Sequence, residues 1–180
     1  WTEFAKAVGP IAYIVRARFV GLRDLGPALS PQSAFQIIQG LETVSLRMEK
    51  HCSNAEKVAE YLSSHNKVSK VIYAGLDEGE AGERANKYLK GGHGALCGFE
   101  LKGGKASGEK FINNLNMFYH VANIGDARSL AIHPATTTHS QLSDEDMESA
   151  GVNPSYVRLS IGIEHIDDII EDLKNALDTA

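Results

Sequence analysis

The sequence lacks the charge pattern of a protein that binds nucleic acid or a membrane surface. Its 180 residues carry 18 Lys and Arg against 23 Asp and Glu, a formal net charge of −5. The basic residues are scattered and form no block with interleaved aromatic residues. Binding to phosphate backbones or anionic lipids relies on clustered positive charge. We therefore expect neither nucleic acid nor a membrane among the partners.

Cysteines and long apolar runs are also scarce. Cys52 and Cys97 form neither a disulfide framework nor a CxxC pair, which favours a reducing compartment. No apolar stretch approaches the length of a membrane span, and no signal-peptide pattern opens the chain. Together these features predict a cytoplasmic protein.

Several catalytic signatures are missing as well. The histidines show no HExxH or HxxxH spacing, so we expect no metal site. No GxSxG segment is present that would place a nucleophilic serine on a strained turn. The glycine-rich segment GGHGALCG (91–98) lacks the GK[ST] ending of a phosphate loop, and its strand-like part follows the glycines. That segment predicts a turn into a buried strand.

The apolar pattern predicts a helical first third followed by an α+β domain. Helical spacing covers 11–24, and Ser30 followed by Pro31 predicts the start of a second helical stretch over 31–64. Gly40 interrupts this stretch, which predicts either two consecutive helices or one kinked helix. Strand-like patterns cover 68–76, 94–103, 118–125, 129–135 and 156–163. Helical patterns cover 82–89, 107–115, a capped start at 143–146, and 166–180.

Arg158 is the strongest site candidate from pattern alone. Alternation in YVRLSIGI (156–163) places Tyr156 and Ser160 on the strand face of Arg158, with Val157 and Leu159 on the other face. A guanidinium on a covered face needs an anionic partner. That partner is either an internal Asp or Glu, or a ligand carboxylate or phosphate, and the pattern leaves both open.

The connection NIGDARSLAIHPATTTHSQLS (123–143) is rich in hydrogen-bonding side chains for so short a segment. Together with YVRLSIGIEHIDDIIEDL (156–173), it resembles the C-terminal region of the Cys/Met-metabolism family of pyridoxal-phosphate (PLP) enzymes. LRDLGPALSPQSAFQIIQGLETVSLRMEKHCSNAEKVAEYL (22–62) resembles the preceding segment of that family. The resemblance covers nearly the whole chain in the expected order.

The resemblance implies an α/β fold, the C-terminal part of a fold-type I PLP-dependent transferase. It implies a small, mostly antiparallel sheet with flanking helices, preceded by a helical segment. The expected divisions are 1–30 as the end of the large PLP-binding domain, 31–64 as the connecting helix or helices, and 65–180 as the C-terminal α/β domain. It also implies a homo-oligomer that acts on a small amino-acid substrate.

Asn123 to Leu130 and the TTTHSQL segment look most like the O-acetylhomoserine sulfhydrylase branch of the family. Lyase-like branches typically carry Ser-Leu-Gly where this chain has Asn-Ile-Gly. The resemblance implies replacement of the acetoxy group by sulfide or methanethiol, giving homocysteine or methionine and acetate. It implies that Arg158 binds the substrate carboxylate, that Asn123 helps to hold it, and that Thr138 lies close by.

Two alternatives to this activity are kept. Within the family, the alternative is a PLP-dependent cystathionine or methionine γ-lyase or synthase. From another class, the alternative is a non-catalytic binding or assembly module.

The Schiff-base lysine of the family has no counterpart here. It follows a Ser-x-Thr sequence, and none of the lysines of this chain follows a Thr. NKYLKGGHG (86–94) imitates the segment after that lysine but departs from it at Asn86 and Lys90, so Lys87 is not assigned to the cofactor. The chain also opens on WTEFAKAVGP without an initiating Met. We expect it to be the last part of a longer enzyme, without cofactor-binding residues and inactive alone.

Overall fold

The computed structural model describes residues 2–180, apart from the side chain of Asp144. The chain divides into two compact units, Trp1–Thr43 and Val44–Ala180. None of the helices in the described residues is both long enough and apolar enough to cross a membrane. The three-part division into 1–30, 31–64 and 65–180 stays a prediction for the whole enzyme.

The first unit is a set of helical segments with almost no core of its own. These segments are α1 (Thr2–Val8), η1 (Gly9–Ile11), α2 (Ala12–Arg16), the π-helical η2 (Ala17–Asp24) and α3 (Pro31–Glu42). The predicted Ser30 cap is confirmed, since its Oγ accepts a hydrogen bond from the Ser33 amide at 3.1 Å. Among the described residues of this unit only Ala12 is buried. Large apolar side chains such as Leu25, Phe35 and Leu41 are more than half exposed.

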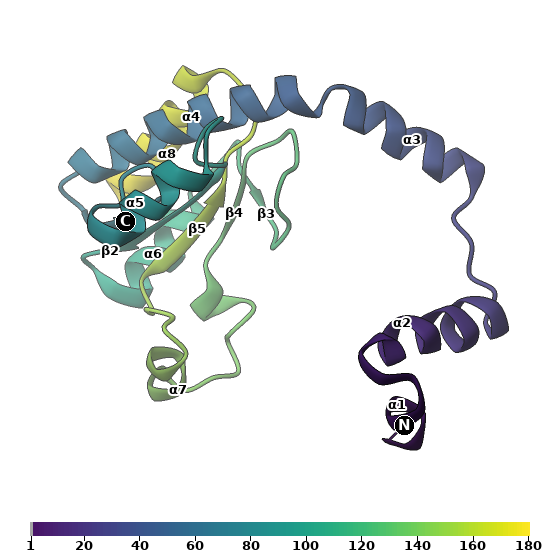
Figure 1. Cartoon of the computed structure of the whole chain (residues 1–180). Coiled ribbons are helices and arrows are strands. Elements are labelled where there is room, and N and C mark those ends of the chain that lie inside the picture. Colours follow the sequence, from purple (N-terminus) through teal and green to yellow (C-terminus); the bar gives the residue numbers. More distant parts are fainter. Residues whose placement is uncertain (1) are drawn as a thin grey trace. The chain divides into compact units, whose positions relative to one another are not determined.

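The second unit is built on a five-stranded sheet flanked by helices (Figure 1). The elements are α4 (Val44–Ser64), β1 (Val68–Ile72), α5 (Gly79–Tyr88), β2 (Leu96–Leu101), α6 (Gly104–Asn113), β3 (Tyr119–His120), β4 (Leu130–Ile132), η3 (Pro134–Thr136), α7 (Asp144–Ser149), β5 (Tyr156–Ser160) and α8 (Ile166–Thr179). The strand order is β1-β2-β5-β4-β3, and only the β3–β4 pair is parallel. The predicted α/β class with a small, mostly antiparallel sheet is confirmed.

Some predicted boundaries differ from the structure for local reasons. The two-helix alternative for 31–64 is correct, but the break falls at Thr43 (φ −111°, ψ 5°) and not at Gly40. The strand predicted over 68–76 ends at Ile72, because the chain turns and the Leu76 amide donates to the Tyr73 carbonyl at 2.9 Å. The strand predicted over 118–125 is reduced to β3, because the chain turns after His120. The Val121 amide donates to the Tyr119 carbonyl at 3.1 Å, and the Gly125 amide donates to the side chain of Ser160 at the end of β5.

Helices α4, α6 and α8 supply the apolar side chains that pack on one face of the sheet. The side chains of Val157, Leu159 and Phe99 are fully buried in this core. Phe99 on β2 meets Phe111 on α6 edge to face, with ring centroids 5.2 Å apart. Figure 1 shows α4 and α8, which contact each other, side by side above the sheet. Val157 and Leu159 of β5 therefore pack in the core, as predicted, and Arg158 lies on the opposite face of the strand.

One buried carboxylate organises the entry into β3. Asp172 on α8 is 7% exposed, and its Oδ atoms accept hydrogen bonds from three consecutive amides. The donors are Asn116 (2.9 Å), Met117 (2.9 Å) and Phe118 (3.3 Å). Since these amides have no strand partner, the carboxylate satisfies groups that would otherwise be buried without a hydrogen bond.

Candidate functional site

The polar face of β5 borders a cavity of about 370 Å³. Tyr156 and Arg158 contribute from β5, and Glu100 contributes from the neighbouring strand β2. Ile72, Ala122 and Ile132 also line it. Two connections complete the lining, one following β4 and one preceding β5. Their lining residues are Pro134, Thr138 and His139 in the first, and Gly151, Val152 and Asn153 in the second. The cavity thus joins segments that are far apart in the sequence.

Arg158 is half-buried at this cavity and is only partly satisfied. Its Nη2 donates to the carbonyl oxygens of Ala122 (2.6 Å) and Asn123 (3.3 Å). Its Nε is buried and has no hydrogen-bond partner among the described residues. Buried donors are nearly always paired in folded proteins, so an orphan in a guanidinium indicates a missing acceptor.

No Asp or Glu among the described residues supplies that acceptor to Arg158. Within the described residues, Arg158 forms no ion pair with a carboxylate. Glu100 lines the cavity, but its Oε2 accepts from Asn153 Nδ2 at 3.1 Å and its Oε1 lies 3.9 Å from Lys70 Nζ. Of the two partners left open by the sequence pattern, the internal acid is not found here.

The carbonyls that face Arg158 belong to a connection that is fixed to the end of β5 and to the chain beyond it. The Gly125 amide donates to Ser160 Oγ at 3.0 Å, and the Ile163 amide donates to the Ala127 carbonyl at 2.8 Å. Glu164 accepts from the Ser129 amide at 2.7 Å. These bonds hold the segment at Gly125, Ala127 and Ser129, while the carbonyls of Ala122 and Asn123 at its other end are bound by Arg158.

Tyr156 forms part of the cavity wall, and the sequence pattern gave it no role beyond sharing a strand face with Arg158. Its ring lies across β2 at Gly98, where an added Cβ would overlap the ring. Burial raises the pKa of the Tyr156 hydroxyl, while the positive charge of Arg158 opposes the shift. The hydroxyl therefore remains protonated near neutral pH and can donate a hydrogen bond into the cavity.

The structure brings two of the three predicted site residues to the same cavity. Thr138 and Arg158 both line it, and Thr138 Oγ1 lies 2.9 Å from His139 Nδ1. Asn123 reaches Arg158 through its backbone carbonyl, and its side chain is exposed. A half-buried guanidinium, a phenol and a hydroxyl around one hollow can bind a small polar anion.

Comparison with known proteins assigns this architecture to a family. The profile described as Cys/Met metabolism PLP-dependent enzyme matches residues 6–178. The chain is 56% identical over 168 residues to an O-acetyl-L-homoserine sulfhydrylase of Leptospira meyeri, an alignment that covers 93% of this chain and 38% of the relative. It is 44% identical over 162 residues to an L-methionine gamma-lyase of Fusobacterium nucleatum subsp. polymorphum, covering 89% of this chain and 41% of the relative.

A solved structure shares the fold. It is a protein of Campylobacter jejuni assigned as an O-acetylhomoserine (thiol)-lyase, which contains N'-pyridoxyl-lysine-5'-monophosphate. The TM-score is 0.82 at 44% sequence identity, and the match covers 94% of this chain and 40% of that chain. The chain therefore spans about two fifths of the length of the proteins to which it is similar.

Proposed function

Since this chain belongs to the Cys/Met metabolism family of PLP-dependent enzymes, we propose that it is part of an O-acetylhomoserine sulfhydrylase. The whole enzyme would replace the acetoxy group of O-acetylhomoserine with sulfide or methanethiol. The products would be acetate and homocysteine, or acetate and methionine. The observation that carries the proposal is the 56% identity to a sulfhydrylase over 93% of this chain, against 44% identity to a γ-lyase.

We propose that PLP is held mainly by the rest of the longer enzyme. No lysine lines the cavity beside Arg158 in residues 2–180. Lys87, the lysine whose surroundings imitate the family pattern, is exposed on α5 with its Nζ 5.2 Å from the Tyr88 ring centroid. The orphaned Nε of Arg158 instead fits the carboxylate of an amino-acid substrate. The roles proposed for this chain are therefore binding and orientation of the substrate.

Arg158 is proposed to bind the α-carboxylate, with Thr138 and Asn123 as neighbours of the bound substrate. A planar guanidinium presents parallel N–H donors that match the two oxygens of a carboxylate. The core packing of Val157 and Leu159 behind it makes β5 a rigid platform. Fixing the carboxylate orients the Cα–H bond toward the base that removes its proton.

Two further properties of the whole enzyme are proposed. The exposed apolar side chains of the first unit, among them Leu25 and Phe35, favour burial against other protein surface. A homo-oligomer is one way to supply that surface. We also propose a cytoplasmic location, which the free cysteines Cys52 and Cys97 favour.

The proposed activity is tested on the full-length enzyme with its cofactor. With O-acetylhomoserine and sulfide, homocysteine and acetate should form in equal amounts, with little 2-oxobutyrate. Predominant release of 2-oxobutyrate and ammonia would assign the γ-lyase activity instead. A protein that binds PLP but consumes neither substrate would contradict both assignments.

Asn123→Ser is expected to weaken substrate binding modestly and to increase the 2-oxobutyrate side product. The substitution leaves the carbonyl that accepts from Arg158 in place and changes only the exposed side chain. The Asn123 amide can donate to a bound carboxylate, whereas the shorter serine hydroxyl loses reach. The measurement is the product ratio and KM for O-acetylhomoserine in the full-length enzyme. Unchanged values would show that the side chain takes no part.

A further inference from the structure

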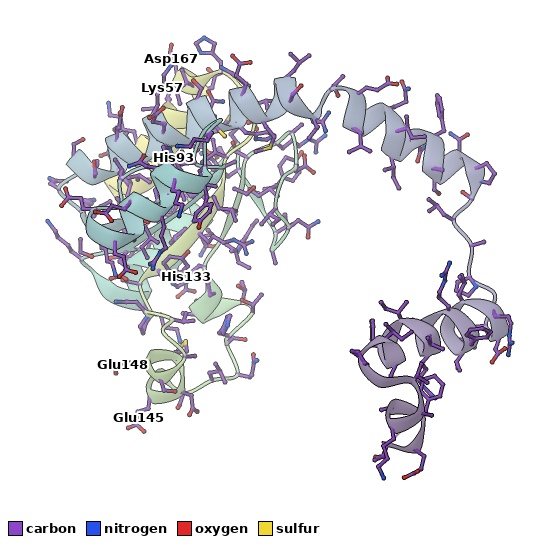
Figure 2. The ribbon with its side chains drawn as sticks, viewed as in Figure 1. Lys57, His93, His133, Glu145, Glu148 and Asp167 are labelled. Atoms are coloured by element: carbon purple, nitrogen blue, oxygen red, sulfur yellow. The ribbon has the colours of Figure 1, made fainter. Side chains whose placement is uncertain are left out.

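The cavity beside Arg158 has two walls made of connections, and one fully buried side chain joins them. The first wall follows β4 and contains Pro134, Thr138 and His139, and the second is the 151–154 segment that leads into β5. His133, at the end of β4, is 0% exposed. Its Nε2 lies 2.8 Å from the Pro154 carbonyl oxygen of the second wall. Figure 2 labels His133 near the end of the sheet closest to α7.

The partners of His133 determine which ring nitrogen carries the proton. The Pro154 carbonyl can only accept, so Nε2 must donate to it. In the neutral ring Nδ1 is then an acceptor, and it lies 2.9 Å from the Thr136 hydroxyl. The single proton of that hydroxyl has the His133 carbonyl, at 3.3 Å, as its other acceptor, and the shorter contact favours Nδ1. Burial lowers the pKa of His133 and so favours this neutral form. The bond to the Pro154 carbonyl offsets part of that shift. The ring therefore makes one directed bond to each wall.

This link is not duplicated. Among the hydrogen bonds of the described residues, no other one connects 133–139 directly with 151–154. The remaining bonds of Thr136 and Thr137 run back to the His133 carbonyl, within the first wall. Asn153 is bound by the adjoining Ser155, and its Nδ2 donates to Glu100 on β2, which ties the second wall to the sheet and not to the first wall.

Helix α6 leaves the ring little freedom to move. A Cβ added at Gly108 would overlap the imidazole, so the backbone of α6 packs directly against it. The ring therefore holds a fixed position between the helix and the two walls. A rigid link of this kind sets how far apart the walls stand.

We propose that His133 is a positioning residue that fixes the separation of the two cavity walls and thereby the fit of the substrate beside Arg158. The inference rests on the proposed function, because it concerns the site that would hold O-acetylhomoserine. His133 touches neither the cavity nor the reacting atoms, and it acts through Thr138 and Asn153. If the link is lost, the walls can move apart and the substrate is held less well, while the guanidinium remains in place.

Two substitutions separate the two bonds of the ring in the full-length enzyme with its cofactor. In His133→Gln the amide nitrogen reaches the region of Nε2 and can still donate to the Pro154 carbonyl. In His133→Asn the shorter amide reaches only the region of Nδ1 and the Thr136 hydroxyl. We expect His133→Asn to raise KM for O-acetylhomoserine about tenfold with kcat within about threefold of wild type. His133→Gln should keep KM within about threefold of wild type.

Asp172→Asn is the matched control for a loss of stability alone. Asp172 is also buried in this unit, but it holds the amides that precede β3 and does not line the cavity. The Asp172→Asn substitution should lower the melting temperature without changing KM for O-acetylhomoserine. A purely structural role for His133 would make His133→Asn behave like this control.

The results that would overturn the inference are distinct from those that would overturn the proposed function. An active His133→Asn enzyme with wild-type KM contradicts the positioning role, and so does a His133→Gln enzyme with the same high KM as His133→Asn. If His133→Asn does not fold, Gly108→Ala decides, because the added Cβ would overlap Nε2 and displace the ring from the Pro154 carbonyl. We then expect KM to rise at least threefold, and a wild-type KM overturns the inference. A wild-type enzyme that forms no homocysteine refutes the proposed function instead.

Discussion

Replacing Arg158 by alanine in the full-length enzyme is expected to lower kcat/KM for O-acetylhomoserine by a factor of about thirty to several thousand. This range corresponds to roughly 2–5 kcal/mol, the cost of truncating one partner of a desolvated charge pair. The guanidinium has a buried Nε without a partner and no carboxylate within the described residues to satisfy it. A substrate carboxylate would therefore find donors that are already dehydrated and already oriented.

The substitution also removes the bonds from Nη2 to the carbonyls of Ala122 and Asn123, so a control must separate loss of the carboxylate contact from loosening of this segment. O-acetylhomoserinamide, in which a neutral amide replaces the carboxylate, provides that control. If Arg158 binds the carboxylate, the alanine enzyme should lose much of the wild-type preference for the acid over the amide. If Arg158 only fixes the 122–129 segment, both substrates should be affected equally.

Two further variants complete the test. Arg158→Lys should recover only part of the activity, because an ammonium keeps the charge but loses the planar pair of donors. Arg128→Ala is the matched surface control, since Arg128 is exposed and lies over the Tyr119 ring at 4.7 Å, outside the cavity lining. A value of kcat/KM for Arg158→Ala within about twofold of wild type would show that the carboxylate assignment is wrong.

The features that the sequence predicted well depend on residues that are close together in the chain. The cap at Ser30 and the cap at Ser143, which accepts from the Asp146 amide at 3.1 Å, are encoded within one helical turn. The two faces of β5 follow from alternation, and full burial of Val157 and Leu159 confirms it. For the same reason Arg158 could be singled out before its surroundings were known.

The features that the sequence did not predict depend on pairings between distant segments. Arg158 and Ala122 are separated by 36 positions in the sequence, and Gly125 and Ser160 are separated by 35. His133 carried no signal in the sequence, because its two partners are a carbonyl and a hydroxyl that form no recognisable motif with it. Such contacts follow from how the strands and connections are assembled, and local periodicity contains no information about them.

The stability of the second unit depends on one of these distant pairings, and Asp172→Ala is expected to lower its free energy of unfolding by about 3 kcal/mol. The substitution leaves the amides of Asn116, Met117 and Phe118 without their acceptor. A buried donor without a partner costs about 1–3 kcal/mol, and partial access of water to this connection keeps the total below the simple sum.

Hydrogen exchange of the β5 amides in the full-length enzyme measures this loss, because the slowest amides of a core strand exchange only when the whole unit opens. Asp172→Asn should cost less, about 1–2 kcal/mol, since one amide oxygen still accepts where two carboxylate oxygens did. Glu171→Ala is the matched control on the same helix, because Glu171 is exposed, and it should change the opening free energy by no more than about 0.5 kcal/mol. If Asp172→Ala costs no more than Glu171→Ala, the three amides must find other acceptors, and the carboxylate does not hold the entry into β3.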